Sequence, residues 1–247
     1  MQNEVMSKNK EELVKDMFKV GAHFGYGRAW HHPSTALYVF GFKNRTAVID
    51  LEKAADSLEE VKDFVRKLGS EGKPIMFVGT KSEARDAVRR GAAQINMPFV
   101  AERWIGGTFT NFSEIRKRIE KMQDLRAKDA KGELSIYTKK ERGVIAKEIK
   151  DLERYFASLE EMTKLPAAIF VVDSKEEAIS IAEAKQKNIP VIALSNSDCN
   201  IKGLEYTIVA NDRAKASIAY FVNHIVEAYK EGKKMIPTPK VETPVVA

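Results

Sequence analysis

Residues 168–194, AIFVVDSKEEAISIAEAKQKNIPVIAL, decide the fold that we expect for this chain. The unbroken apolar runs at 168–172 and 190–194 are typical of strands buried on both faces. Between them, the apolar spacing predicts a helix over 175–188. A strand, a helix and a second strand of this kind indicate a parallel sheet covered by helices.

The same alternation recurs on both sides of this unit. Outside it, the sequence predicts an N-terminal helix, two strands around a basic turn, and then further strands and helices in alternation. We therefore expect an α/β fold with a doubly wound, mainly parallel sheet. The expected ranges are helices at 1–20, 51–68, 82–96 and 215–231, and strands at 36–40, 46–49, 75–78, 99–100 and 207–209.

Residues 113–162 interrupt the alternation, because no strand signal occurs there. The apolar residues Ile145, Ile149, Leu152, Phe156 and Leu159 follow heptad steps, and Ile115, Ile119 and Met122 begin a similar series. We expect an inserted antiparallel coiled-coil helical hairpin. The predicted organisation is a discontinuous α/β domain at 1–112 and 163–232, a protruding hairpin at 113–162, and a flexible C-terminal tail at 233–247.

The charge of the chain points to an anionic partner. Its 247 residues carry a net charge of +6, and its sequence pI is about 9.2. Nucleic acid is favoured over a lipid surface, although many soluble enzymes carry a modest positive charge. The lone cysteine, Cys199, excludes an intramolecular disulfide and fits a reducing cytosol. No leader and no membrane-spanning run is apparent in the sequence, so we expect a cytoplasmic protein that does not contact a membrane.

The most distinctive stretch is AERWIGGTFTNF at residues 101–112, which runs into the basic segment 113–118. Arg103 offers bidentate phosphate contact, and the Gly106-Gly107 pair permits close backbone approach or simply forms a turn. Trp104 would stack on a base or lie in the core; the sequence leaves both open. This combination favours binding over catalysis.

Three further segments carry candidate residues. The loop at 78–83 lies between a strand and a helix; we interpret it as a tight turn from which Lys81 and Arg85 reach a phosphate backbone. Residues 21–33 contain Arg28 and the histidines His23, His31 and His32, where a nucleic-acid surface or structural histidines are favoured over a metal site. The turn at 43–45 presents Lys43 and Arg45 as an exposed basic tip.

Polar residues at adjacent strand ends suggest one rival function. Asp173, Ser174 and Ser195 would meet at one sheet edge, where a hydrolase or a nucleotide-binding enzyme has its site. The expected last helix contains His224, so no histidine is placed for a triad, and helix capping explains Asp173 and Ser174 better. The alternative hypothesis is a nucleotide-binding α/β enzyme that uses the strand ends near Gly79 and Asp173.

Several motifs in order resemble one known family. They include GAHFG at 21–25, YVFG at 38–41, FVGTK at 77–81, RWIGGTFTNF at 103–112, FVVD at 170–173 and ND at 211–212. Together they closely resemble the bacterial type of the second protein of the small ribosomal subunit, from about residue 14 to 232. The pattern differs from that family at Tyr26, where a histidine is usual, at Ala167, where an aspartate is usual, and at Ala210, where a glycine is usual.

The resemblance implies a flavodoxin-like domain with a coiled-coil hairpin, held by ribosomal RNA between the head and the body of the subunit. It further implies neighbouring small-subunit proteins as partners, including the large mRNA-binding ribosomal protein, and no enzymatic activity. A metal occurs in some relatives, but we expect no metal, cofactor or small-molecule substrate here. Cations would neutralise phosphates, and the other polar groups would bond sugar or phosphate oxygens. The expected RNA-binding residues are Arg28, Lys43, Arg45, Lys81, Arg85, Arg103, Trp104, Gly106, Gly107, Thr108, Thr110, Asn111, Arg116 and Lys117.

Overall fold

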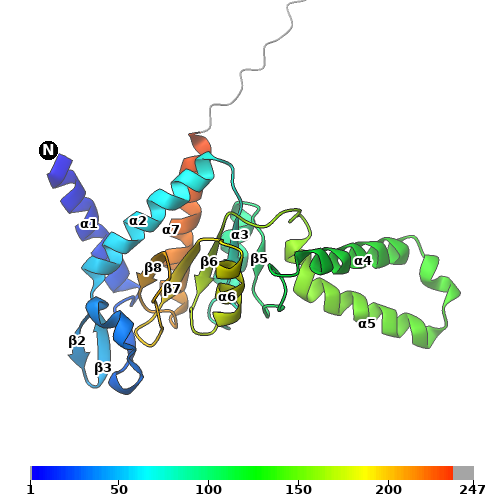
Figure 1. Ribbon diagram of the computed structural model, residues 1–247, viewed down its shortest axis with the longest axis horizontal. Helices are drawn as coiled ribbons and strands as arrows, with labels where there is room; N and C mark the ends of the chain where they lie inside the picture. The colour runs from blue at the N-terminus through cyan, green and yellow to red at the C-terminus, as the bar shows by residue number, and fades with distance from the viewer. Residues whose placement is uncertain (1, 236–247) are drawn as a thin grey trace, which may run out of the picture.

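A parallel five-stranded sheet forms the centre of the molecule. The computed structural model describes residues 2–235, of which 2–9 are described by their backbone alone (Figure 1). The strand order is β5-β4-β6-β7-β8, and every neighbouring pair is parallel. The chain is therefore an α/β protein, as the sequence predicts. The strands are β4 (Ile75–Val78), β5 (Phe99–Val100), β6 (Ala168–Val172), β7 (Val191–Ser195) and β8 (Tyr206–Val209).

Alternate residues of each central strand supply two separate cores, because successive side chains of a strand point to opposite faces. In β6, Phe170 packs into one core, whereas Ile169 and Val171 pack into the other. The first core lies under α2 (Leu51–Ser70), α3 (Arg85–Gln94) and α7 (Lys215–Lys234). A Cβ atom on Gly232 of α7 would collide with the carbonyl oxygen of Arg66, so this glycine permits the close crossing of α7 and α2.

The second core lies under α6 (Ala178–Gln186), the loop at 101–111 and the base of a helical hairpin. The hairpin consists of α4 (Phe112–Ala130) and α5 (Lys139–Phe156), which lie side by side and project from the sheet (Figure 1). A short 3-10 turn (Glu133–Ile136) connects them, and Thr138 and Glu141 form a capping box that begins α5. Ile119 and Met122 of α4 are fully buried in the second core, as the heptad pattern predicts.

The N-terminal part forms a small lobe at the carboxyl ends of the central strands. It contains α1 (Gln2–Lys19) and the antiparallel sheet β1-β3-β2, made of β1 (Phe24–Gly27), β2 (Val39–Lys43) and β3 (Thr46–Ile49). The sequence predicted no strand at the position of β1 and placed one at 36–40. Instead, Pro33 begins a 3-10 turn that His32 caps, and β2 starts only at Val39. β1 is short and glycine-rich, so its pairing with β3 determines its structure.

The remaining element boundaries differ from the expected ones by a few residues. The helices α3 and α6 begin three residues later than predicted, because a turn first carries the chain away from the strand end. The last helix continues to Lys234, two residues into the expected tail, and residues 236–247 lie outside the described part of the chain. Within residues 2–235, no helix combines the length and the apolar character needed to cross a bilayer.

Candidate functional site

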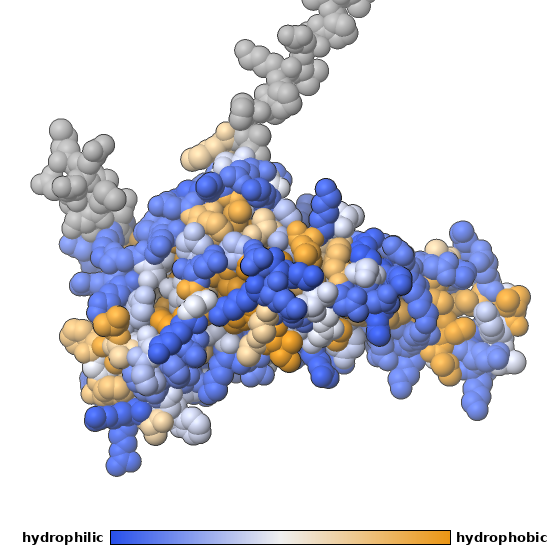
Figure 2. All heavy atoms as spheres, in the orientation of Figure 1, coloured by the Kyte–Doolittle hydropathy of each residue, from blue (hydrophilic) through white to orange (hydrophobic). Residues whose placement is uncertain are grey.

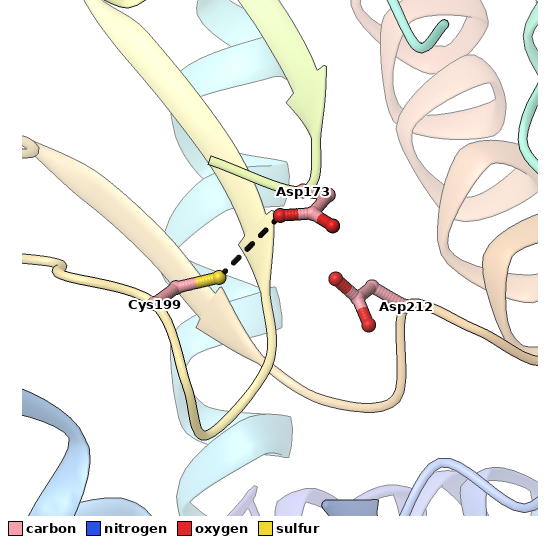
Figure 3. A group of neighbouring side chains, drawn as sticks. All are labelled: Asp173, Cys199 and Asp212. Carbon is pink, nitrogen blue, oxygen red and sulfur yellow. Dashed lines mark hydrogen bonds between the residues drawn. The ribbon is translucent and has the colours of Figure 1, made fainter. Parts of the chain in front are cut away.

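A buried ion-pair network occupies the carboxyl ends of the central strands. Lys81 follows β4, and its Nζ atom lies 2.8 Å from Oδ2 of Asp173 and 3.4 Å from Oδ2 of Asp212. Asp173 ends β6, Asp212 follows β8, and the thiol of Cys199 donates to Oδ1 of Asp173 at 3.6 Å (Figure 3). Asn196 donates to the other oxygen of Asp212 at 2.9 Å. The strand ends thus bring together residues that are far apart in the sequence.

The two carboxylates respond differently to this environment. Burial alone would raise the pKa of Asp173, but Lys81 and the backbone N–H groups of Glu176 and Lys175 outweigh it and lower that pKa. Burial, together with the charge of Asp173, raises the pKa of Asp212 to about 6. Burial would lower the pKa of Lys81, yet both carboxylates hold it above its usual value. The site therefore contains a fixed ammonium between two unequal carboxyl groups.

The donor atoms of Asp173, Cys199 and Asp212 lie within 4.8 Å of one another, close enough to be considered as metal ligands. The Lys81 ammonium already lies within ion-pair distance of both carboxylates. Burial also raises the pKa of Cys199 to about 12, so its sulfur is a protonated thiol at neutral pH and a poor metal ligand. This geometry favours an ion-pair network over a metal centre.

The N-terminal lobe covers the crevice in which α/β enzymes hold their ligands. His32 donates its backbone N–H to the carbonyl of Ser197 at 2.8 Å, and Tyr26 donates its own to the hydroxyl of the same serine at 2.8 Å. Asn211 donates to the carbonyl of Ala22 at 2.9 Å. Ser195 bonds Ser174 at 2.8 Å rather than a general base. These contacts give no support to a nucleotide-binding or hydrolytic site there.

The histidines of the lobe have structural surroundings. The ring of His23 stacks on Phe18 with centroids 4.4 Å apart, and His32 accepts a hydrogen bond from Ser34. His31 meets Phe42 edge-on at 5.9 Å. In the described residues, none of these histidines belongs to a group of three metal-ligand side chains. Among the described residues, Nδ1 of His23 and Nε2 of His31 are buried without a hydrogen-bond partner, so a role for these histidines at a nucleic-acid surface stays a prediction.

The diglycine loop encloses a carboxylate of the chain itself. Oε1 of Glu183 accepts from the Trp104 indole at 3.0 Å and from the backbone of Gly107 at 2.8 Å. Its Oε2 accepts from the backbones of Phe109 and Thr110 at 2.9 and 3.0 Å, and from the Thr110 hydroxyl at 3.1 Å. Gly107 has φ of +93°, which glycine adopts without strain. The loop is built as an anion nest, and Glu183 fills it.

Several side chains that we expected at an RNA surface are therefore buried in the protein. Trp104 is buried against Phe109, which leaves no free face for a base and agrees with the core alternative for this residue. Thr108 is 1% exposed and bonds the carbonyl of Ile105. Burial would raise the pKa of Glu183, but the indole and the loop N–H groups lower it. Gly106 and Asn111 remain exposed beside the nest.

The predicted cations fall into two groups. Lys81 is enclosed between carboxylates; Arg85 bonds the carbonyl of Thr80 at 3.0 Å, and Lys117 pairs with Glu114 at 2.7 Å. In the part of the chain that the structure describes, the second group has no carboxylate within ion-pair distance, and all its members are exposed: Arg28, Lys43, Arg45 and Arg103. Only this second group is free to meet an external anion.

Arg116 belongs to the base of the hairpin. Its Nη1 donates to the carbonyls of Glu160 and Met162, both at 3.2 Å, so it ties α4 to the segment after α5. Arg116 thus has a role in the fold, and its contact with RNA stays a prediction.

We predict that Arg116→Ala lowers the free energy of unfolding by about 1–2 kcal/mol, because the backbone carbonyls of Glu160 and Met162 lose their charged hydrogen-bond donor. Arg103→Ala, at an exposed and unpaired arginine, should leave it unchanged within about 0.5 kcal/mol. Urea denaturation of both variants measures the difference. Equal stability of Arg116→Ala and the wild-type chain would contradict the structural role.

Two features were missed by the sequence reasoning. Glu183 lies on the same buried face of the expected helix as Ser180 and Ala184. A carboxylate on a buried helix face needs hydrogen-bond donors, and this was the sequence signal that could have indicated a partner for it. Glu102 gathers Arg85, Arg89 and Arg154 from α3 and α5, a set that no local pattern reveals. The three arginines share a single carboxylate.

The structure thus defines the class: an α/β protein whose strand-end crevice is closed by its own residues and from which a helical hairpin projects. Residues 17–232 match the family model described as Ribosomal protein S2. This match covers most of the chain, and the chain belongs to that family. The family consists of structural, non-enzymatic, RNA-binding proteins of the small ribosomal subunit that serve translation.

Proposed function

We propose that this protein binds small-subunit ribosomal RNA and bridges the head and the body of the subunit, as a cytoplasmic, ribosome-bound structural component. Its α/β domain, with the flavodoxin-like strand order, would hold one contact surface, and a coiled-coil hairpin would extend a second. Neighbouring small-subunit proteins, including the large mRNA-binding ribosomal protein, would complete the set of partners. We assign it no catalytic role.

One observation carries this proposal: among the cations predicted to bind RNA, those that are exposed and have no carboxylate partner in the described residues lie at two separate places. Arg28, Lys43 and Arg45 lie on the N-terminal lobe, and Arg103 lies at the base of the hairpin. Cations that already pair with a carboxylate gain little from a phosphate, because the pair must first be broken. Unpaired cations contribute fully to the release of counterions from RNA.

Arg103 lines a pocket of about 230 Å³ together with Arg89 and Arg154. Glu102 and Glu153 also line the pocket, and Glu102 bonds both of those arginines, so three arginines face two carboxylates with an excess of one positive charge. Guanidinium groups that converge from different elements match the oxygens of a phosphate. We assign this pocket to a phosphate of the RNA backbone.

The hairpin adds a long positively charged surface. Residues 113–154 hold 13 lysines and arginines against 9 aspartates and glutamates, an excess of +4. Its apolar seam is buried at the base, which leaves the charged faces of α4 and α5 to the surroundings. This charge supports a contact with RNA along the hairpin, and Lys117 and Asn111 lie where the hairpin meets the domain.

We predict that the triple variant Arg28→Ala, Lys43→Ala, Arg45→Ala lowers the slope of log affinity against log salt by about 2–3, since each phosphate contact contributes close to one. Fluorescence anisotropy with a small-subunit RNA fragment measures this slope. The triple variant Lys10→Ala, Lys62→Ala, Lys73→Ala removes the same charge from lysines that already pair with carboxylates, so its slope should change less. Equal slopes in the two variants would contradict the assignment.

A further inference from the structure

The N-terminal lobe concentrates both positive charge and aromatic rings. Residues 17–49 contain four lysines and arginines and no aspartate or glutamate, so this segment carries +4 of the net charge of +6. The same segment contains seven of the chain's 21 phenylalanine, tyrosine and tryptophan residues. A third of the aromatic rings and most of the net charge thus lie in a seventh of the chain.

Five of these seven rings are exposed although the fold has two cores to bury them in: Phe18, Phe24, Trp30, Phe40 and Phe42. Phe40 is 82% exposed, Trp30 is 68% exposed and Phe42 is 44% exposed. Hydrophobic side chains gather on the surface at the end of the molecule where β2 and β3 lie (Figure 2). Exposed rings of this size normally mark a binding surface, because burial would otherwise stabilise the fold.

Cations accompany the exposed rings at close range. The guanidinium of Arg28 lies 5.4 Å from the centroid of Phe42, and Nζ of Lys175 lies 5.8 Å from the centroid of Trp30. Lys43 and Arg45 flank the β2–β3 turn, where Arg45 has φ of +64° and is exposed. Lys175 pairs with Asp198, whereas Arg28, Lys43 and Arg45 have no carboxylate partner in the described residues. The rings and these three cations present stacking faces and phosphate partners together.

We propose that this surface, formed by Arg28, Trp30, Phe40, Phe42, Lys43 and Arg45, is a stacking platform for unpaired RNA nucleotides. Aromatic side chains stack on splayed-out bases, which a duplex does not offer, and the cations hold the adjoining phosphates. The lack of any carboxylate in the segment fits a polyanion better than a protein partner. The inference rests on the proposed RNA-binding function and names the kind of RNA that this lobe takes.

The test uses the full-length chain and two labelled probes: a single-stranded oligouridylate of 12 nucleotides and an RNA duplex of the same length. Phe40→Ala and Trp30→Ala should each weaken binding to the single strand by about 10-fold, since stacking on one ring carries a substantial share of affinity per base. Binding to the duplex should change by less than about 2-fold, because its bases are already stacked. Phe40→Tyr keeps an aromatic face and should bind like the wild-type chain.

Phe40→Leu separates stacking from simple apolar contact, because leucine keeps the hydrophobic surface but has no ring. Under the platform model it should bind as weakly as Phe40→Ala. Trp30, the exposed member of the two tryptophans, should also lose fluorescence on addition of the single strand, a signal that Trp30→Phe removes.

Full affinity of Phe40→Leu, or equal losses on single strand and duplex, would overturn the platform. If the Phe40 and Trp30 variants bind the single strand like the wild-type chain while the wild-type chain still joins small subunits, the platform fails and the proposed function stands. If the wild-type chain binds no small-subunit RNA, both fail. Preference for anionic vesicles over either RNA would also overturn the proposal.

Discussion

Replacing Glu183 with alanine should lower the free energy of unfolding by about 3–5 kcal/mol, the largest loss that we expect from any single carboxylate. The side chain is 7% exposed and accepts five hydrogen bonds, three of them from the backbone of the diglycine loop. Without it, the indole of Trp104 and the loop N–H groups lose their acceptor. Urea denaturation, followed by the near-ultraviolet signal of Trp104, measures the loss.

Glu183→Gln tests the charge at nearly constant size, with an expected loss of about 2 kcal/mol, because the amide offers only one acceptor oxygen to two sets of donors. Since the folded-state pKa of Glu183 is lowered, the stabilisation by the carboxylate is present above its ordinary value of 4.5 and is lost as the pH falls through the folded pKa. The difference between wild type and Glu183→Gln should therefore be full at pH 7 and shrink below about pH 4.5.

The exposed Glu176→Ala serves as the control and should stay within about 0.5 kcal/mol of the wild-type chain. If Glu183→Ala were as stable as the wild-type chain, water would be able to accept the hydrogen bonds of the loop N–H groups, and the loop would not depend on this carboxylate. A difference between wild type and Glu183→Gln that does not vary with pH would show that ionisation of Glu183 is not the stabilising property.

Lys81→Met should destabilise the protein by about 3–5 kcal/mol near pH 8, because it leaves two buried carboxylates without their shared cation. The effect should decrease with acid. The pKa of Asp212 is about 6 in the wild-type chain, where Lys81 lowers it, so removal of Lys81 should raise this pKa further. As the pH falls, the folded variant then takes up a proton before the folded wild-type chain does, and the carboxylate repulsion is relieved. The stability deficit of Lys81→Met should therefore be smaller at pH 5 than at pH 8.

The double variant Lys81→Met, Asp212→Asn removes one of the two charges and should recover part of the loss, with a weaker dependence on pH between 4 and 6. Lys175→Met, at an exposed lysine paired with Asp198, is the matched control and should change stability little. If Lys81→Met shows the same deficit at both pH values, the carboxylates do not govern this site.

Much of the fold follows from local patterns. The apolar runs at 75–78, 168–172 and 190–194 predicted the central strands to within a residue, because a strand buried on both faces has few alternatives. The β1 strand and the 3-10 turn at Pro33–Tyr38 were missed, since β1 forms by pairing with β3 across a distance in sequence. Local propensity carries no information about such a partner.

The candidate site shows the same division. The sequence indicated an anion-binding loop at the diglycine pair, and the loop has that geometry, but its anion is Glu183, 76 residues away from Gly107. The sequence likewise marked Lys81 as a phosphate contact, and the structure encloses it between Asp173 and Asp212. Residue type and local conformation predicted that these groups bind an anion. Which residue supplies that anion depends on the fold.

By itself, the sequence determined the α/β architecture, the inserted hairpin and the positive charge of the N-terminal lobe, because these depend on periodicity and composition. Only the tertiary structure decided which cations are free. A lysine or arginine has the same local signature whether a carboxylate from another strand meets it or not. Lys81 meets two such carboxylates, whereas Arg45 meets none in the described residues. The packing of distant segments sets the electrostatic environment of each charge, and that environment selects the residues available to RNA.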